Sequence, residues 1–136
     1  MKLVLDTNIL VSALLTKNTP PDQLYQQWVG GLFDLVSSDW QLDELKRVLG
    51  YKKLRPFILK SEASLLIENL DSIAFMASDL VPCEVSPDPA DNWIIATAIA
   101  GEANLIVSGD KSDLLALGSV RGIEILNPRA ALNLFV

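Results

Sequence analysis

The sequence predicts an α/β fold: a three-layer α/β/α sandwich around a central, mainly parallel sheet. Two observations lead to this prediction. Short apolar runs that suit buried strands alternate along the chain with longer helical segments. Strands separated by helices pair in parallel and are covered by helices on both faces. With 136 residues the chain matches the size of one domain, so residues 1–136 are expected to form a single unit.

In the first half of the chain, turn and capping residues separate the predicted elements. An Asp-Thr-Asn turn follows the first apolar run, two prolines open the second helix, and Ser37, Ser38 or Asp39 can cap the third. The expected elements are a strand over 2–5, a helix over 9–15, a helix from 19 to about 30, a strand over 33–36, a helix to about 50 and a long helix over 61–77.

In the second half, the strongest signal is Asp88-Pro89, because Asp88 suits an N-cap and a proline suits the first helical position. The helix that follows is apolar on every side from Trp93 to Ala100 and stops at Gly101, so it should lie centrally in the fold. The other expected elements are a third strand at 80–81, a buried strand over 105–108, a short helix over 112–117, an edge strand over 122–126 and a last helix capped at 127–128.

The composition limits the chemistry of any active site. The chain has no histidine and a single cysteine, Cys83, so an internal disulfide is excluded and any bound metal must have oxygen ligands. A net charge of −6 argues against nonspecific coating of DNA. No apolar stretch reaches the roughly 18 residues of a membrane helix, and the start of the chain does not resemble a signal peptide. We therefore expect a cytoplasmic protein without membrane contact.

Four carboxylates are expected to converge at one edge of the sheet. Asp6 follows the first strand and Asp110 follows the strand over 105–108, so both emerge at the carboxyl edge, where open sheets bind ligands. Asp91 projects from the start of the central helix, and a helical wheel places Glu44 at the border of a buried face. Such a cluster favours a cation, and oxygen ligands select Mg²⁺ or Mn²⁺. These ions hydrolyse phosphodiesters by activating water.

Each of these acids also has a purely structural explanation. Asp6 can cap the helix that follows it, and Asp91 can complement the helix dipole. Asp110 can be a turn residue, and Glu44 lies on an amphipathic boundary where acids are common. The four structural explanations are independent of one another, whereas one metal site accounts for all four acids together.

Basic residues gather between Glu44 and Glu62, an interval that contains no acid. This segment is either a solvated face or a surface that contacts a phosphate backbone. Asp43, just before it, has an ordinary explanation as the (i, i+4) partner of Arg47. The candidate backbone-contacting residues are Lys46, Arg47, Lys52, Lys53 and Arg55.

Four motifs resemble those of the PIN-domain ribonucleases in type and order: Leu-Asp-Thr-Asn-Ile-Leu-Val-Ser, Asp-Glu-Leu, Asp-Pro-Ala-Asp-Asn and Val-Ser-Gly-Asp-Lys. The similarity spans nearly the whole chain and points to the small prokaryotic branch of VapC-like toxins from type II toxin–antitoxin pairs. The resemblance implies one PIN-like nuclease domain over 1–136. It also implies a Mg²⁺- or Mn²⁺-dependent endoribonuclease that binds RNA, is often a homodimer and is inhibited by a cognate antitoxin.

The resemblance also assigns roles to individual residues. The implied catalytic and metal-binding acids are Asp6, Glu44, Asp91 and Asp110. The implied supporting residues are Thr7, Asn8 and Ser12. Two positions depart from the family pattern: Ala90 stands where related sequences often have a further Asp, and Ser112 separates Lys111 from Asp113. Asp113 therefore ranks below the four acids as a metal ligand.

Two other functions stay open at this point. The chain can be a catalytically weak PIN-like module that only binds a partner, although its four acids speak against decay. An aspartate-based phosphatase or phosphoacceptor domain also has an Asp after its first strand. The halo-acid-dehalogenase phosphatases have a second Asp two residues later, and Asn8 stands at that position here.

Overall fold

The computed structural model describes residues 1–109 and 113–135. Its strands are β1 (Lys2–Leu5), β2 (Asp34–Ser38), β3 (Phe75–Ala77), β4 (Leu105–Val107), β5 (Ser119–Val120) and β6 (Ile123–Leu126). Its helices are α1 (Thr7–Leu15), α2 (Pro20–Val29), α3 (Asp39–Leu49), the short 3₁₀ helix η1 (Lys52–Leu54), α4 (Lys60–Ile73), α5 (Pro89–Ala100), α6 (Asp113–Leu117) and α7 (Pro128–Asn133). None of the helices in the described ranges is long and apolar enough to span a membrane.

The described strands form one sheet in the order β3-β2-β1-β4-β6-β5. Neighbouring strands pair in parallel, except that β5 pairs antiparallel with β6. The sheet extends from β1 in one direction through β2 and β3, and in the other through β4. β1 therefore lies where the strand order reverses, and in open α/β sheets ligands bind at the carboxyl ends of the strands at this position.

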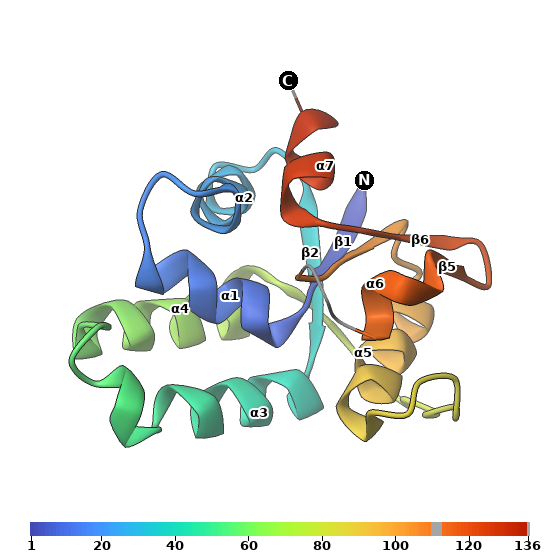
Figure 1. The fold of residues 1–136 in the computed structure, drawn as a ribbon, viewed down its shortest axis with the longest axis horizontal. Helices are drawn as coiled ribbons and strands as arrows, with labels where there is room; N and C mark the ends of the chain where they lie inside the picture. Colours follow the sequence, from blue (N-terminus) through green and yellow to red (C-terminus); the bar gives the residue numbers. More distant parts are fainter. Residues whose placement is uncertain (110–112, 136) are drawn as a thin grey trace.

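Helices cover both faces of the sheet, which confirms the predicted three-layer sandwich (Figure 1). α5 and α6 lie on one face, and α1, α2, α4 and α7 lie on the other. Alternate residues of β1 serve the two faces: Leu3 and Leu5 pack in one core cluster and Val4 packs in the other. This alternation fixes the register of β1 and therefore also the position of Asp6, which follows the strand.

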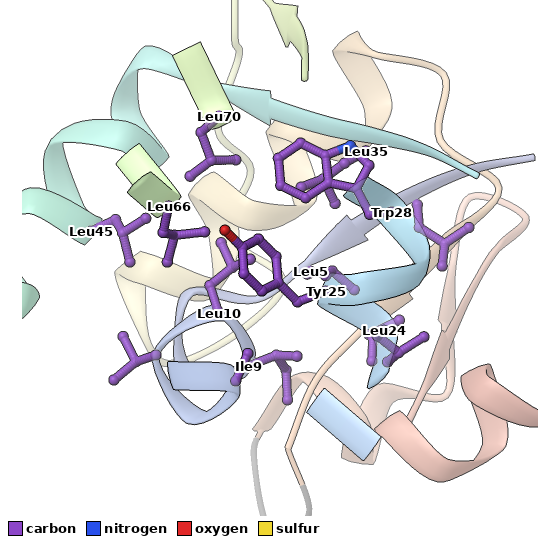
Figure 2. Packing of buried hydrophobic residues seen from close by; sticks show 14 of the residues in the cluster. Leu5, Ile9, Leu10, Leu24, Tyr25, Trp28, Leu35, Leu45, Leu66 and Leu70 are labelled. Carbon is purple, nitrogen blue, oxygen red and sulfur yellow. The ribbon is translucent and has the colours of Figure 1, made fainter. Parts of the chain in front are cut away.

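The larger core cluster holds α1, α2 and α4 against the sheet. Leu10 of α1, Leu24 of α2 and Leu66 of α4 are fully buried in it, together with Leu5 of β1 (Figure 2). Burying each of these side chains contributes about 1.5–3 kcal/mol. The start of α1 is thereby fixed at the end of β1.

The helix α5 lies across the opposite face, as its all-round apolar character predicts. Ile94, Ile95 and Ala98 are buried there. Gly101 ends the helix against Val36 of β2, and a Cβ atom at Gly101 would lie 2.3 Å from Val36 Cγ1. Glycine is therefore required for this close approach of α5 to the sheet.

Two strand predictions are wrong. The third strand lies at Phe75–Ala77 rather than at 80–81, and α4 ends at Ile73 rather than continuing to Ala77. Pairing with β2 overrides the local helical character of this segment. The strand expected at the edge over 122–126 is β6, which lies inside the sheet because β5 pairs with its outer side.

Candidate active site

A cavity of about 400 Å³ opens beyond the carboxyl end of β1, at the starts of α1 and α5 and beside α3. The structure brings four of the five predicted metal-binding acids to it, while the fifth, Asp110, lies outside the described residues. Among the described lining residues, five carry carboxylates and none is basic, so this part of the cavity concentrates negative charge. The lining residues are Asp6, Thr7, Asn8, Glu44, Val48, Asp88, Ala90, Asp91 and Asp113.

Asp6 joins β1 to α1 and is held from both sides. Its N–H donates to the Val107 carbonyl at 2.9 Å, and its own carbonyl accepts the first helical hydrogen bonds of α1. The Ser108 hydroxyl donates to Asp6 Oδ2 at 2.9 Å. Asp6 is the N-cap residue of α1, which begins at Thr7 rather than at residue 9, but in the described structure its carboxylate makes none of the hydrogen bonds to N2 or N3 by which an aspartate caps a helix. Such a bond therefore does not explain the burial of this acid.

The pKa of Asp6 is raised from 3.8 to about 6, and burial is the largest cause. The negative charges of Asp91 and Glu44 also act to raise this pKa, while the hydrogen bonds from Ser108 and from the Thr7 backbone act to lower it. The shift follows from desolvation first and from neighbouring acids second. The fold thus holds a carboxylate in a place that disfavours its charge.

Asp91 lies in the first turn of α5 and is buried as well. The Ser86 hydroxyl donates to Asp91 Oδ2 at 2.8 Å. Burial raises the pKa of Asp91, the bond from Ser86 lowers it, and the charges of Asp88 and Asp113 raise it. Asp88 caps α5 through a bond from the Ala90 N–H at 3.0 Å, as its position before a proline predicts.

Asn92 places Ser86 beside Asp91. Its Oδ1 accepts from the backbone N–H of Val85 at 3.1 Å and of Ser86 at 2.8 Å, and its Nδ2 donates to the Ser86 carbonyl at 3.0 Å. These bonds fasten the loop before α5 to the helix itself. Sequence analysis predicted a supporting role for neither Ser86 nor Asn92. Only the position of Asn92 next to Asp91 could have suggested that Asn92 contributes to the site.

Glu44 and Asp113 form the open side of the cavity. Glu44 lies on α3 with 13% of its side chain exposed, which agrees with the helical-wheel prediction. The Arg47 guanidinium lies 3.9 Å from Glu44 Oε2, so Arg47 pairs with Glu44 and the prediction of an Asp43–Arg47 pair is wrong. The (i, i+3) geometry brings the guanidinium over the half-buried acid. Asp113 is exposed at the start of α6.

The helix that carries Glu44 is anchored to both neighbouring elements. Gln41 Nε2 donates to the Leu5 carbonyl of β1 at 2.7 Å. Ser38, which caps α3, lies with its hydroxyl 2.9 Å from that of Thr97 on α5. The rings of Trp40 and Trp93 stack with centroids 5.9 Å apart. These contacts fix Glu44 relative to Asp6 and Asp91.

The three predicted supporting residues occupy different environments. Thr7 is buried, and within the described residues its hydroxyl has no hydrogen-bond partner. Asn8 is exposed and lines the cavity, whereas Ser12 lies one turn further along α1 and is not part of the lining. The side chain that donates to Asp6 is Ser108, which follows β4. A small polar residue at the end of the strand next to β1 was a usable sequence signal.

The donor set fits a hard divalent cation. Two buried carboxylates with raised pKa values and the unpartnered Thr7 hydroxyl supply oxygen ligands, and a cation would offset the cost of burying the two charges. Within residues 1–109 and 113–135, however, no three His, Cys, Asp or Glu side chains lie closely enough to hold an ion. The described acids alone do not complete a metal site.

The predicted backbone-contacting residues are all exposed and follow one another from α3 into η1. In the described part of the chain, Arg47 is the one among them with an ion pair to an acid. The remaining members of the group present free positive charge to solvent. They are Lys46, Lys52, Lys53 and Arg55.

A family model described as the PIN domain matches residues 2–112. PIN domains are typically nucleases. The matched range contains the whole of the chain from β1 to the end of β4, including Asp6, Glu44 and Asp91. None of the curated proteins matches the chain.

Proposed function

The chain belongs to the PIN-domain family, and we propose that it is a Mg²⁺- or Mn²⁺-dependent endoribonuclease that hydrolyses RNA phosphodiester bonds with an activated water molecule. The observation that carries this proposal is the pair Asp6 and Asp91. The two acids come from distant parts of the sequence, are buried at one cavity and have raised pKa values without a basic partner in its described lining.

Asp6 and Asp91 are the first ligands that we propose for the ion. We also propose Glu44 and Asp113 as ligands, because they lie on the open side of the cavity. Asp110 is proposed as a ligand from its position after β4 in the sequence. The bound ion would lower the pKa of water and stabilise charge on the attacking and leaving oxygens. Oxygen-only ligation favours Mg²⁺ or Mn²⁺ over zinc.

The chain's own residues hold and orient the reacting groups. Ser108 and Ser86 donate to the inner carboxylates, which orients these carboxylates and favours their ionised form. Arg47 brings a positive charge to the rim beside Glu44, where a backbone phosphate can be held. In the reaction, the water oxygen bonds to phosphorus and the ribose oxygen departs with a proton. No covalent bond to the protein forms.

Cleavage of RNA with Mg²⁺ or Mn²⁺ tests the proposal. We expect the wild type to cut RNA and Asp6→Asn to be about 10²-fold slower or worse, because the change removes an anionic ligand while keeping its shape. Asp43→Asn is the matched control, since Asp43 is an exposed acid on α3 outside the cavity, and it should retain activity. Equal cleavage by the wild type and Asp6→Asn would overturn the proposal.

The biological role that we propose is the toxin of a toxin–antitoxin pair, acting in the cytoplasm as a homodimer until a cognate antitoxin binds. The support is the resemblance of the four motifs to VapC-like toxins. Production of the wild type in a bacterial host should arrest growth, whereas Asp6→Asn should not. Efficient RNA cleavage in vitro without any growth arrest would contradict the toxin role and leave the nuclease proposal intact.

A further inference from the structure

Two cations lie close to one aromatic side chain just beyond the end of α3. Tyr51 is 37% exposed, and its ring centroid is 5.9 Å from the Arg47 guanidinium carbon and 5.8 Å from Lys53 Nζ. Arg47 also donates a hydrogen bond to the Tyr51 hydroxyl. We propose that Tyr51, Arg47 and Lys53 form a subsite for an unpaired nucleotide of the substrate. This inference rests on the proposed ribonuclease function.

The cluster is connected to the candidate active site through Arg47. The same guanidinium lies 3.9 Å from Glu44, which lines the cavity, and bonds to Tyr51. Residues 44, 47 and 51 follow i, i+3, i+7 spacing, and the N–H of Tyr51, just beyond the end of α3, still donates to the Val48 carbonyl, so the three follow one side of the helix and its continuation. Seven residues of helix span about 10 Å. A short run of nucleotides can therefore reach from Tyr51 to the cavity.

The charge around Tyr51 favours a polyanion. Between Glu44 and Glu62 the sequence contains basic residues and no acids, in a chain whose net charge is −6. The exposed side chains of Lys46, Lys52 and Lys53 make no ion pair with an acid in the described part of the chain. This concentration of positive charge lies along α3 and η1, which run outward from the sheet in Figure 1.

The combination of a ring and flanking cations indicates a single strand rather than a duplex. An unpaired base can stack on an aromatic ring or on a guanidinium plane while neighbouring cations hold its phosphates. In a duplex the bases are stacked on each other and cannot reach the ring. Lysines alone would bind both forms through their phosphates, so Tyr51 is the residue that selects unpaired RNA.

Binding of RNA in EDTA separates this subsite from catalysis. The probe is a fluorescent single-stranded RNA 12-mer without self-complementarity, compared by anisotropy with its perfect duplex. We expect Tyr51→Leu to bind the single strand about 10-fold more weakly than the wild type and the duplex equally well. Tyr51→Phe keeps the ring and should stay within about 2-fold of the wild type. Thermal unfolding of each variant checks that the fold is retained.

Two further variants sharpen the test. Phe57→Leu is the matched control, because Phe57 is an aromatic residue of the same segment, is 69% exposed and has no cation over its ring in the described residues. It should bind like the wild type. Lys53→Gln should reduce the slope of log affinity against log salt concentration by about 0.7, the value for one phosphate contact on a single strand.

The outcomes distinguish the subsite from the proposed function. Single-strand binding by Tyr51→Leu equal to that of the wild type would overturn the subsite, and so would an equal loss of single-strand and duplex affinity. If Asp6→Asn cuts RNA normally while Tyr51→Leu still loses single-strand binding, the catalytic proposal fails and the subsite stands. If Asp6→Asn is inactive and Tyr51→Leu binds normally, the subsite fails alone.

Discussion

The acids on the inner and outer sides of the cavity differ in burial and in their contact with water. On the inner side, Asp6 and Asp91 are buried, each accepts a hydrogen bond from a serine, and burial raises both pKa values. On the outer side, Glu44 lies beside Arg47 and Asp113 is exposed. The inner acids cost stability when they are charged, whereas the outer acids keep their contact with water. The fold therefore concentrates its electrostatic strain in the two residues that we expect to bind a cation most tightly.

The largest expected effect comes from removing the inner charge. The pKa of Asp6 is about 6 in the folded protein and 3.8 without the fold, so the folded state binds this proton more tightly than the unfolded state. Ionisation of Asp6 thus lowers the free energy of unfolding as pH rises from about 4 to about 6. In EDTA, Asp6→Asn should be more stable than the wild type by about 3 kcal/mol at pH 7 and by less than about 1 kcal/mol at pH 4.

Chemical denaturation at several pH values measures this difference. A stability gain for Asp6→Asn that does not change with pH would show that packing, and not the buried charge, is responsible. Addition of Mn²⁺ should stabilise the wild type and leave Asp6→Asn nearly unchanged, because only the ionised site gains from the cation.

A smaller effect is expected from weakening the support of the other inner acid. Ser86→Ala removes the hydrogen bond to Asp91 and the acceptor of the Asp88 N–H, which should reduce the free energy of unfolding by about 1–3 kcal/mol at pH 7. Loss of the donor raises the pKa of Asp91 further, so the cost should shrink as pH falls and Asp91 becomes protonated. Equal losses at pH 7 and pH 4 would contradict this role of Ser86.

The smallest effect on stability is expected on the outer side. Glu44→Gln removes an ion pair whose arginine side chain is 61% exposed, and such pairs contribute about 0–1 kcal/mol. Unfolding should therefore be almost unchanged, while RNA cleavage with Mn²⁺ should fall by about 10-fold or more. If Glu44→Gln retains full cleavage, Glu44 is not part of the proposed catalytic site, and the inner acids act without it.

The parts of the fold that sequence reasoning predicted well are those fixed by local chemistry. Asp88 caps α5 as expected, and the short apolar run at the start of the chain is a buried strand that ends just before Asp6. β3 was missed because residues 75–77 become a strand only by pairing with β2, a contact that no local pattern encodes. The catalytic and metal-binding roles of the predicted acids stay predictions.

The partners of the supporting side chains were not predictable from the sequence, for a related reason. Ser108 reaches Asp6 across 102 positions of sequence, and Ser86 reaches Asp91 through a loop whose path depends on Asn92. Arg47 pairs with Glu44 rather than Asp43, which the wheel alone could not decide. Spacing along the chain identifies a helix face, but the fold decides which neighbour a flexible side chain contacts.

The reversal of strand order at β1 has a consequence for the timing of activity. Asp6 and Glu44 belong to the first 49 residues, whereas Asp91 and Asp113 lie in the last third of the chain. A growing chain that has folded only as far as α4 contains two of these four acids and lacks α5. Under the proposed function, the protein cannot cut RNA until α5 has packed on the sheet and brought Asp91 beside Asp6, so the ribosome that makes it works beside an inactive enzyme until that helix has been synthesised and folded.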